Sequence, residues 1–227
     1  MIARVRLSIV VPALDSAKFL PACLDALAHA SAAERILVDG GSQDGTPALA
    51  QARGWRVIEA PRGRGPQLAA GAAAATGDWL LFVHADTVLA PGWAAAVAGF
   101  VHAPENADRA AHFRLAFDSP DPRARRVERL ANWRARTFGL PYGDQALLIA
   151  RAHYAALGGY RPLALMEDVD LVRRIGRARL HALDAAAVTS AARYERDGWR
   201  ARPLRNLACL ALWFAGVSPD AIRRLYR

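Results

Sequence analysis

The stretch Asp78-Trp-Leu-Leu-Phe-Val-His-Ala-Asp-Thr87 decides the fold of this chain. Its apolar run, residues 79–83, is continuous and ends abruptly at His84-Ala85-Asp86. A continuous apolar run bounded by polar residues is typical of a strand buried on both faces of a parallel sheet. A carboxylate just beyond such a strand lies where open α/β sheets bind ligands, although a turn-capping role for Asp86 is the simpler alternative.

The composition predicts one globular domain with ample core, because 53% of the 227 residues are hydrophobic and 22% are charged. The net charge is +9, and Lys18 is the only lysine among 30 basic residues. A positive field favours anionic partners such as nucleotides and phosphates. Aromatic and basic residues are not interleaved as they are in single-strand-binding proteins, so we expect no nucleic-acid partner.

Cys23 and Cys209 are the only cysteines, and no Cys-x-x-Cys pair occurs. We therefore expect neither a disulfide framework nor a zinc site. The N-terminus runs directly into an expected strand with no signal peptide, and no apolar run reaches the roughly 18 residues of a membrane-spanning helix. These features predict a cytoplasmic protein, either soluble or peripheral at the inner face of the membrane.

Strands and helices alternate over residues 1–90. The expected strands are 5–11, 35–38, 57–58 and 79–83. The first helix follows a cap at Asp15 or Ser16, the second opens at Thr46-Pro47, and the third covers 67–75. This order implies right-handed crossovers and a parallel sheet.

The alternation changes after Pro91, which marks two halves of one domain. The second half predicts a helix over 93–101, a half-exposed strand over 110–117 with His112 and Arg114 outward, and a basic helix over 123–138. A buried strand over 145–149, a helix after Met166-Glu-Asp168, two short strands (179–183 and 187–190) and two helices within 203–227 follow.

Each strand of the first half is followed by a charged side chain: Asp15, Asp39, Arg64 and Asp86. A parallel sheet places these side chains along one edge. Glycines in the loop 39–46 let the backbone approach a ligand closely. Neither Gly-x-Gly-x-x-Gly nor Gly-x-x-x-x-Gly-Lys-Ser/Thr occurs, which excludes the usual dinucleotide and P-loop sites. The pattern suits a nucleoside held by carboxylates.

Four motifs resemble, in order and spacing, those of the family 2 glycosyltransferases. They are Ser8-Ile-Val-Val-Pro12, Val38-Asp-Gly-Gly-Ser-Gln-Asp-Gly-Thr46, Gly77-Asp-Trp-Leu-Leu-Phe-Val-His-Ala-Asp86 and Met166-Glu-Asp-Val-Asp-Leu171. The resemblance covers nearly the whole chain. The His-Ala-Asp-Thr form and Gly143-Asp-Gln-Ala146 look like a small bacterial subgroup of that family.

The resemblance implies an α/β GT-A fold, with a mostly parallel central sheet, flanking helices and a C-terminal helical segment. It implies a catalytic domain over 1–202, with a nucleotide-binding half (1–90) and an acceptor half (91–202), followed by the segment 203–227. The implied reaction moves a sugar from a nucleotide-diphosphate sugar, expected to be a UDP-sugar, to an acceptor hydroxyl with inversion. Inversion by single displacement needs a general base and stabilisation of the departing diphosphate.

His84-Ala85-Asp86 stands where the family has Asp-x-Asp. The resemblance therefore places Asp86 at the metal-ligand position, for Mg²⁺ or Mn²⁺ held together with phosphate oxygens. His84 replaces the first aspartate, and an imidazole ligand favours Mn²⁺ over Mg²⁺. A polar residue that merely ends the strand is the alternative for His84.

Five further residues match the nucleotide site of the family. Asp39 matches the carboxylate that holds the nucleoside, and Pro12 and Ala13 match backbone that lines the base. Asp15 stands where relatives often have glutamate. Arg64 matches a basic residue near the base or the diphosphate.

Glu167-Asp168 matches the Glu-Asp motif, whose aspartate is the catalytic base of the family. A helix-capping role is the alternative for Asp168, and we expect Asp170 to face elsewhere. Asp144 is a second candidate base, or an acceptor-binding group together with Gln145.

Ser190-Ala-Ala-Arg193-Tyr194 resembles a degenerate Gln-x-x-Arg-Trp motif. Arg193 would then neutralise diphosphate and Tyr194 would stack on the acceptor, whereas a solvated arginine is the alternative for Arg193. The segment 203–227 either packs on the domain or forms an interfacial amphipathic surface, which would bring the site to a lipid-linked acceptor.

Two other functions stay open at this point. A sugar-phosphate nucleotidyltransferase shares the arrangement of strands and loops, but it needs a glycine-rich loop where this chain has Pro12-Ala13-Leu14-Asp15. A nucleotide-sugar-binding pseudoenzyme is the non-catalytic alternative. It is suggested by His84, Ser190 and Ala69, which stands where relatives usually carry asparagine.

Overall fold

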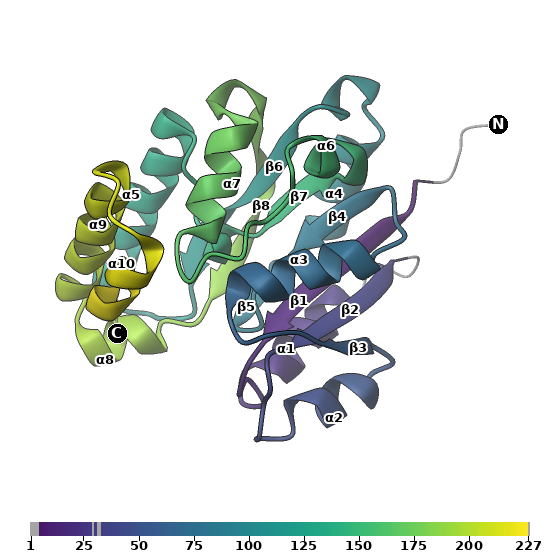
Figure 1. Ribbon diagram of the computed structural model, residues 1–227, viewed down its shortest axis with the longest axis horizontal. Helices are drawn as coiled ribbons and strands as arrows, with labels where there is room; N and C mark the ends of the chain where they lie inside the picture. The colour runs from purple at the N-terminus through teal and green to yellow at the C-terminus, as the bar shows by residue number, and fades with distance from the viewer. Residues whose placement is uncertain (1–4, 29, 31–32, 227) are drawn as a thin grey trace.

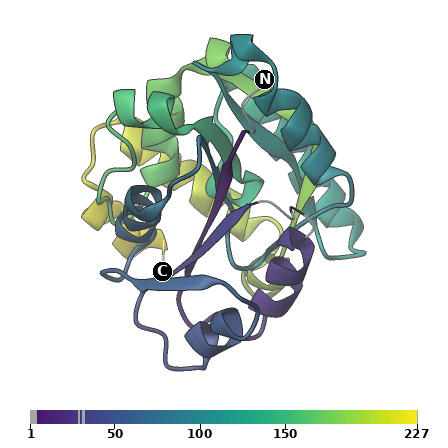
Figure 2. The ribbon, with the colours of Figure 1, turned by 90° about the vertical axis from the view of Figure 1, so that its right-hand side faces the viewer.

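One sheet with helices on both faces makes up the fold, and the computed structural model describes residues 5–28, 30 and 33–226 (Figures 1 and 2). The strands are β1 (Leu7–Ala13), β2 (Glu34–Asp39), β3 (Arg56–Glu59), β4 (Trp79–Phe82), β5 (Thr87–Leu89), β6 (Ala110–Phe117), β7 (Leu147–Ala150) and β8 (Leu180–Thr189). The helices are α1 (Leu20–Leu27), α2 (Thr46–Gln51), α3 (Arg64–Ala74), α4 (Trp93–Val101), α5 (Pro122–Phe138), α6 (Arg151–Ala156), α7 (Glu167–Ile175), α8 (Ala192–Asp197), α9 (Ala201–Phe214) and α10 (Pro219–Tyr226). Single 3-10 turns are η1 (Pro104–Asn106), η2 (Gly143–Gln145) and η3 (Arg177–Arg179).

The first four strands lie side by side in the order β3-β2-β1-β4 and run parallel, as the alternating pattern predicts. Val10 of β1 pairs with Ile36 on one side and with Phe82 on the other. Ile9 and Val11 face the core that contains α1 and α4, whereas Val10 faces the core that contains α3 and α7. Both faces are therefore apolar, which explains the continuous hydrophobic runs.

The remaining strands add antiparallel pairings, so the sheet is mixed rather than purely parallel. β7 pairs antiparallel with β4, β6 with β7, and β5 with β8, while β6 and β8 run parallel. β8 is one strand, whereas the sequence predicts two, because the fully exposed Asp184 and a register shift opposite His112/Arg114 interrupt its apolar pattern. β5, α6 and α8 lie in segments for which the sequence predicts no element.

β6 is more buried than its alternating sequence predicts, because α5 packs along it. Asn132 of α5 accepts a hydrogen bond from Leu115 N (2.8 Å) and donates one to Leu115 O (3.0 Å). Glu128 accepts one from Phe117 N (2.7 Å). His112, expected to face outward, is only 3% exposed.

The predicted cap of α1 is wrong, because Phe19 is the N-cap residue and no side chain caps the helix. The Asp15 carboxylate instead accepts a hydrogen bond from Gln43 N (2.9 Å). The Ser16 hydroxyl donates to Leu14 O (3.1 Å). Both side chains therefore order the loop after β1, and Asp15 ties it to the loop after β2.

The C-terminal helices α9 and α10 pack against each other and against the second half of the sheet domain (Figure 1). The expected boundary at 202/203 falls inside α9. Ile222 of α10 is fully buried, and Cys23 and Cys209 are buried free thiols, as expected for core residues. No helix in the described part of the chain is long and apolar enough to cross a membrane.

Candidate active site

Two adjoining cavities open at the carboxyl ends of β1 and β4. The open groove runs along the loop after β1 and the start of α3, and it is lined by Pro12, Ala13, Asp15, Arg62, Gln67, Ala85, Arg196 and Arg223, among others. The inner pocket lies between η2, the start of α7 and the helices α8 to α10. The two cavities share Arg64, His84, Asp86, Leu165, Ser190, Arg193 and Tyr226.

The wall of the open groove is held by hydrogen bonds between neighbouring loops. Asp15, with φ of 46°, donates from its backbone N–H to Ser42 Oγ (2.9 Å). Gln67, which the sequence motifs do not single out, is 3% exposed and donates to Ala13 O (2.7 Å) and Val38 O (2.8 Å). One side chain of α3 thus joins the ends of β1 and β2 below the groove.

Asp39 does not line either cavity. Its side chain is 4% exposed and accepts hydrogen bonds from Gly41 N and Ser42 N, each at 2.9 Å, and from Ser42 Oγ at 2.5 Å. In this arrangement the carboxylate shapes the loop after β2. Its contact with a nucleoside stays a prediction.

Asp86 and His84 meet where the groove joins the inner pocket. Within the residues that the structure describes, the Asp86 carboxylate accepts no hydrogen bond. Burial lowers the pKa of His84 to about 4, with the nearby Arg64 charge adding to the effect, so the imidazole is neutral at pH 7. A free carboxylate and a neutral imidazole are chemically suited to bind a divalent ion.

These two side chains do not complete a metal site alone. Among residues 5–28, 30 and 33–226, no three His, Cys, Asp or Glu side chains gather closely enough to hold an ion. Divalent ions at nucleotide sites are commonly bound by one or two protein ligands plus phosphate oxygens. The donor set therefore fits an ion that binds together with a phosphate ligand.

Asp168 lines the inner pocket close to His84. Its Oδ2 atom accepts a hydrogen bond from Gly143 N and its Oδ1 atom accepts one from Val169 N, each at 2.7 Å. A Cβ atom on Gly143 would lie 2.5 Å from His84 Nε2, so only glycine lets η2 approach the imidazole this closely. Asp168 is the second residue of α7, and its carboxylate is oriented both by the backbone of η2 and by the first turn of its own helix.

Glu167 lies behind the site rather than in it. Its carboxylate is 1% exposed and forms an ion pair with Arg64 Nε at 2.9 Å. Burial raises the pKa of Glu167, and the Arg64 charge opposes this rise. The geometry gives Glu167 the task of holding Arg64 at the junction of the cavities, and a direct catalytic part for it stays a prediction.

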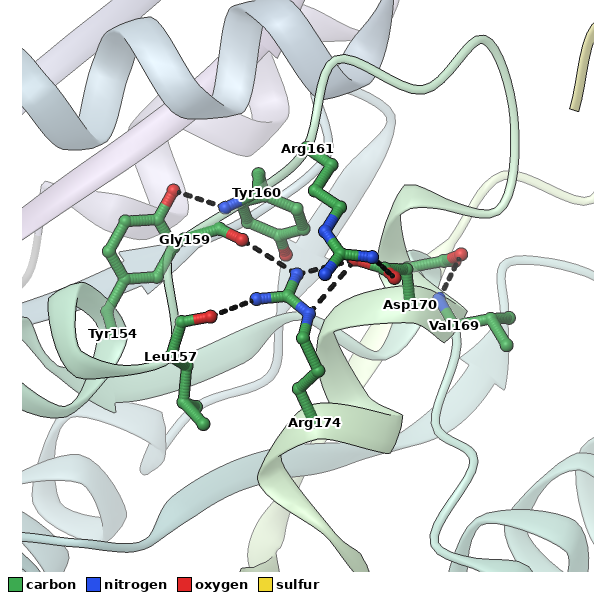
Figure 3. Close-up of polar contacts among 9 residues, drawn as sticks. Tyr154, Leu157, Gly159, Tyr160, Arg161, Val169, Asp170 and Arg174 are labelled. Carbon is green, nitrogen blue, oxygen red and sulfur yellow. Dashed lines mark hydrogen bonds and ion pairs between the residues drawn. The ribbon is translucent and has the colours of Figure 1, made fainter.

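Asp170 faces away from the cavities, as expected. It pairs with Arg161 at 3.1 Å and with Arg174 at 2.5 Å (Figure 3). Arg174 also donates to Leu157 O (2.5 Å) and Gly159 O (2.7 Å). This cluster fastens the loop before α7 to the helix.

Asp144 lines the inner pocket, whereas its neighbour Gln145 does not. Burial raises the pKa of Asp144 to about 6, although the Arg134 charge opposes the rise. Gln145 is fully buried and donates to Phe113 O (3.0 Å). Asp144 is therefore available to a ligand, and Gln145 supports η2 from behind.

Arg193 and Tyr194 both reach the site from α8. Arg193 is exposed, lines both cavities and has no ion-pair partner among the described residues. Tyr194 lines the inner pocket while its ring contacts Phe117 (centroids 4.7 Å apart) and stacks on Trp199 (5.3 Å). The aromatic cluster fixes the far wall of the pocket.

The C-terminal helices contribute Arg202, Asn206 and Tyr226 to the inner pocket. Arg202 is 5% exposed and donates to Asp197 (2.9 Å) and to Tyr226 Oη (2.7 Å). Sequence reasoning missed these residues. Positions 202 and 206 are four residues apart, so the sequence does indicate that the two side chains share one face of a helix. It does not indicate that this face lines a pocket, because apolar residues make up most of the segment.

The sequence model described as "Glycosyl transferase family 2" matches residues 8–157. The chain belongs to this family. A stretch of this chain is 41% identical over 91 residues to the PGL/p-HBAD biosynthesis glycosyltransferases of Mycobacterium tuberculosis and Mycobacterium bovis. That match covers 36% of this chain and about a third (36%) of the length of those relatives.

Solved structures share the GT-A fold with this chain. Glucosyl-3-phosphoglycerate synthase from M. tuberculosis, in complex with Mn²⁺, UDP and glucosyl-3-phosphoglycerate, has a TM-score of 0.61 and 20% identity, covering 82% of this chain and 72% of its own. S. aureus TarS has a TM-score of 0.63 and 16% identity, and the match covers 97% of this chain and 69% of TarS 1-349. The mannosyltransferase PcManGT from Pyrobaculum calidifontis, in complex with GDP-Man and Mn²⁺, has a TM-score of 0.65 and 17% identity. That match covers 92% of this chain and 62% of the PcManGT chain. The GT-A architecture expected from the sequence is confirmed.

Proposed function

We propose that this family 2 glycosyltransferase transfers a sugar from a UDP-sugar to an acceptor hydroxyl with inversion. One observation carries the proposal: Arg64, His84, Asp86 and Arg193 lie at the junction of the open groove and the inner pocket, with Asp168 in the pocket beside them. A nucleotide in the groove would place its diphosphate at this junction. An acceptor in the inner pocket would then face the sugar from the side of Asp168.

Each side chain has a task in this reaction. Asp168, oriented by Gly143 N–H, takes the proton from the acceptor hydroxyl as it attacks. Arg64 and Arg193 offset the negative charge that develops on the departing diphosphate. Asp86 and His84 would hold a Mg²⁺ or Mn²⁺ ion, which supplies further positive charge beside the diphosphate.

The donor assignment has support from the neighbours. The solved glucosyl-3-phosphoglycerate synthase complexes contain UDP with Mn²⁺, and PcManGT contains GDP-Man with Mn²⁺. For the acceptor we propose a lipid-linked alcohol. The relatives named for PGL/p-HBAD biosynthesis and the exposed apolar residues of 203–227 support that class.

A thermal-shift screen tests the donor, with UDP and GDP added in the presence and absence of Mn²⁺. We expect UDP with Mn²⁺ to raise the melting temperature most, through linkage between binding and folding. No shift from any nucleotide with metal present would overturn the assignment. Release of UDP from UDP-glucose by the wild type, but not by Asp168→Asn, would exclude a pseudoenzyme.

A further inference from the structure

Helix α9 is apolar on its solvent-facing side as well as on its core-facing side. Its exposed positions carry no polar side chain; they are Ala201, Leu204, Leu207, Ala208, Ala211 and Phe214. Leu204 is 66% exposed and Leu207 is 60% exposed. Arg202 and Asn206, by contrast, line the inner pocket. A surface helix normally buries one apolar face, as α9 does with Cys209 and Leu210, so its exposed leucines form a second apolar face.

The large exposed apolar side chains of the described residues all belong to three helices. Leu130, Trp133 and Phe138 lie on α5, Leu204, Leu207 and Phe214 on α9, and Leu225 on α10. The three helices gather at one end of the molecule, away from α2 and β3 (Figure 1). Scattered single apolar residues are ordinary on a surface, whereas a cluster of this kind marks an interaction site.

A groove connects the apolar residues of α5 with those of α9. Phe138 at the end of α5 and Phe214 at the end of α9 both line it, together with Val172 and Arg173 of α7. The Arg173 guanidinium lies 4.9 Å from the centre of the Phe214 ring. The exposed faces of α5 and α9 therefore form one surface, which we name the α5–α9 surface.

The α5–α9 surface is basic as well as apolar. Five exposed arginines on or beside it have no carboxylate within ion-pair distance in the part of the chain that the structure describes; they are Arg126, Arg129, Arg136, Arg173 and Arg177. The one acidic residue of α5, Glu128, is buried and binds Phe117 N and Arg125. Unpaired cations beside Trp133 and Leu130 match the charge and polarity of an anionic lipid surface.

We propose that the α5–α9 surface docks this protein on an anionic bilayer. Two such faces would repel each other through their arginines, which disfavours a second copy as the occupant. The inward residues of α9 line the inner pocket, so docking places that pocket about 10 Å, the diameter of one helix, from the lipid. Docking would bring a lipid-linked acceptor close to the inner pocket, and this consequence rests on the proposed function. The membrane contact itself does not depend on that function.

Vesicle co-sedimentation with the full chain tests the surface. The probes are vesicles of phosphatidylcholine alone and of phosphatidylcholine mixed with phosphatidylglycerol. We expect binding to the mixed vesicles and little binding to the neutral ones, with weaker binding as salt rises. Equal binding to both, or binding to neither, would overturn the proposal.

Two variants and a matched control locate the contact. Arg126→Gln/Arg129→Gln should weaken partition to the mixed vesicles about 30-fold, because each arginine near the surface contributes about a factor of five. Arg53→Gln/Arg56→Gln removes the same charge near α2 and β3 and should leave partition unchanged. Leu204→Gln/Leu207→Gln should weaken it at every salt concentration, since it removes apolar contact. Equal losses in the α5 variant and the control would mean that net charge alone attracts the protein, which overturns the surface.

Light scattering after size-exclusion chromatography measures the oligomeric state, and so tests whether a second copy of this chain occupies the surface. A dimer that Leu204→Gln/Leu207→Gln dissociates, in a protein that binds no vesicle, would assign the surface to a second copy and overturn the proposal. The thermal shift by UDP with Mn²⁺ is recorded for the same variants. If UDP with Mn²⁺ still shifts the melting temperature but no vesicles bind, the docking surface is overturned and the proposed function stands. If vesicles bind but UDP with Mn²⁺ gives no shift, the proposed function is overturned and the docking surface stands.

Discussion

The open groove and the inner pocket meet at the same residues but are built in different ways. The groove is walled largely by loops that follow β1 and by the start of α3, with hydrogen bonds between near neighbours in the sheet. The inner pocket is walled by side chains from η2, α7, α8, α9 and α10. Its walls therefore depend on how helices far apart in the sequence pack together.

This difference explains why the two cavities leave different traces in a sequence. A loop that holds itself in shape needs particular residues at fixed spacing, as Asp39 and Ser42 show. A wall made by helix packing needs only a suitable side chain at one position on a helix face. The groove thus has recognisable motifs, whereas the pocket is the part in which family members can differ in acceptor.

The largest expected effect lies in the inner pocket. Asp168→Asn should lower the rate of sugar transfer about 100- to 10,000-fold, because it removes the general base. The UDP-induced thermal shift should stay, since the groove is intact. Rates of UDP release measure the effect, with the exposed Asp25→Asn as a control. Turnover at the wild-type rate would move the base elsewhere in the pocket, and Asp144→Asn would then be the next variant to measure.

The joint between the cavities comes next. Arg64→Met leaves the Glu167 carboxylate, 1% exposed, without its cation and should cost about 3 kcal/mol of unfolding free energy. Urea denaturation measures this change. Arg64→Met/Glu167→Gln should recover part of the loss, because the buried charge is gone. A double variant no more stable than the single one would show that the pair is not coupled.

The groove itself is tested through the metal. Asp86→Asn should abolish the extra stabilisation that Mn²⁺ gives to the UDP complex. That stabilisation is about 2.7 kcal/mol when the Mn²⁺ concentration is a hundredfold above its Kd for the UDP complex. Melting temperatures with UDP, with and without Mn²⁺, measure it. If the Mn²⁺-dependent part survives in Asp86→Asn, the ion binds elsewhere.

A smaller effect is expected at Tyr226 of α10. Tyr226→Phe removes the hydroxyl that accepts a hydrogen bond from Arg202 at 2.7 Å and should cost about 1 kcal/mol of stability. It should raise KM for the acceptor more than for the donor, since the Arg202 guanidinium that it holds lines the inner pocket and not the groove. Steady-state kinetics separate the two constants, and Arg224→Gln, an exposed change on the same helix, is the control. Equal changes in both KM values would argue against a pocket-specific role.

The smallest effect is one of pH. Hydrogen bonds and charges from Arg196 and Arg202 lower the pKa of Asp197 to about 2, from an ordinary value of 3.8. Because the folded-state pKa is depressed, this contribution to stability is fully present above about pH 4 and is lost as the pH falls from about 4 towards 2. Melting temperatures across this range should fall less steeply for Asp197→Asn than for the wild type. Identical slopes would mean that Asp197 does not anchor α8 to α9.

Much of the first half could be predicted from the sequence because each strand there is buried on both faces. Val10 and its neighbours alternate between two cores, so hydrophobic runs and the loops that interrupt them are clear. The second half misleads because its surroundings override the local pattern. His112 alternates like an exposed residue but is buried, and Asp184 interrupts a strand that continues past it.

The candidate site divides in the same way. Asp86, Arg64 and Asp168, which their motifs single out, line one pocket, and their roles stay predictions. The burial of Glu167 and Gln145 could not be foreseen, because a motif does not show which side of a turn faces the cavity. The position of Tyr226 could not be predicted for another reason, because no motif near it in the sequence indicates that α10 folds back over the pocket.

Seven residues belong to both cavities, and this sharing has a kinetic consequence. A nucleotide-sugar that fills the groove would itself complete one wall of the inner pocket, because Asp86, Arg193 and Tyr226 border both spaces. The acceptor would then have its full set of contacts only after the donor has bound. The enzyme should therefore follow a compulsory order, with the donor binding first and the nucleotide leaving last, and UDP should inhibit competitively against the donor and noncompetitively against the acceptor.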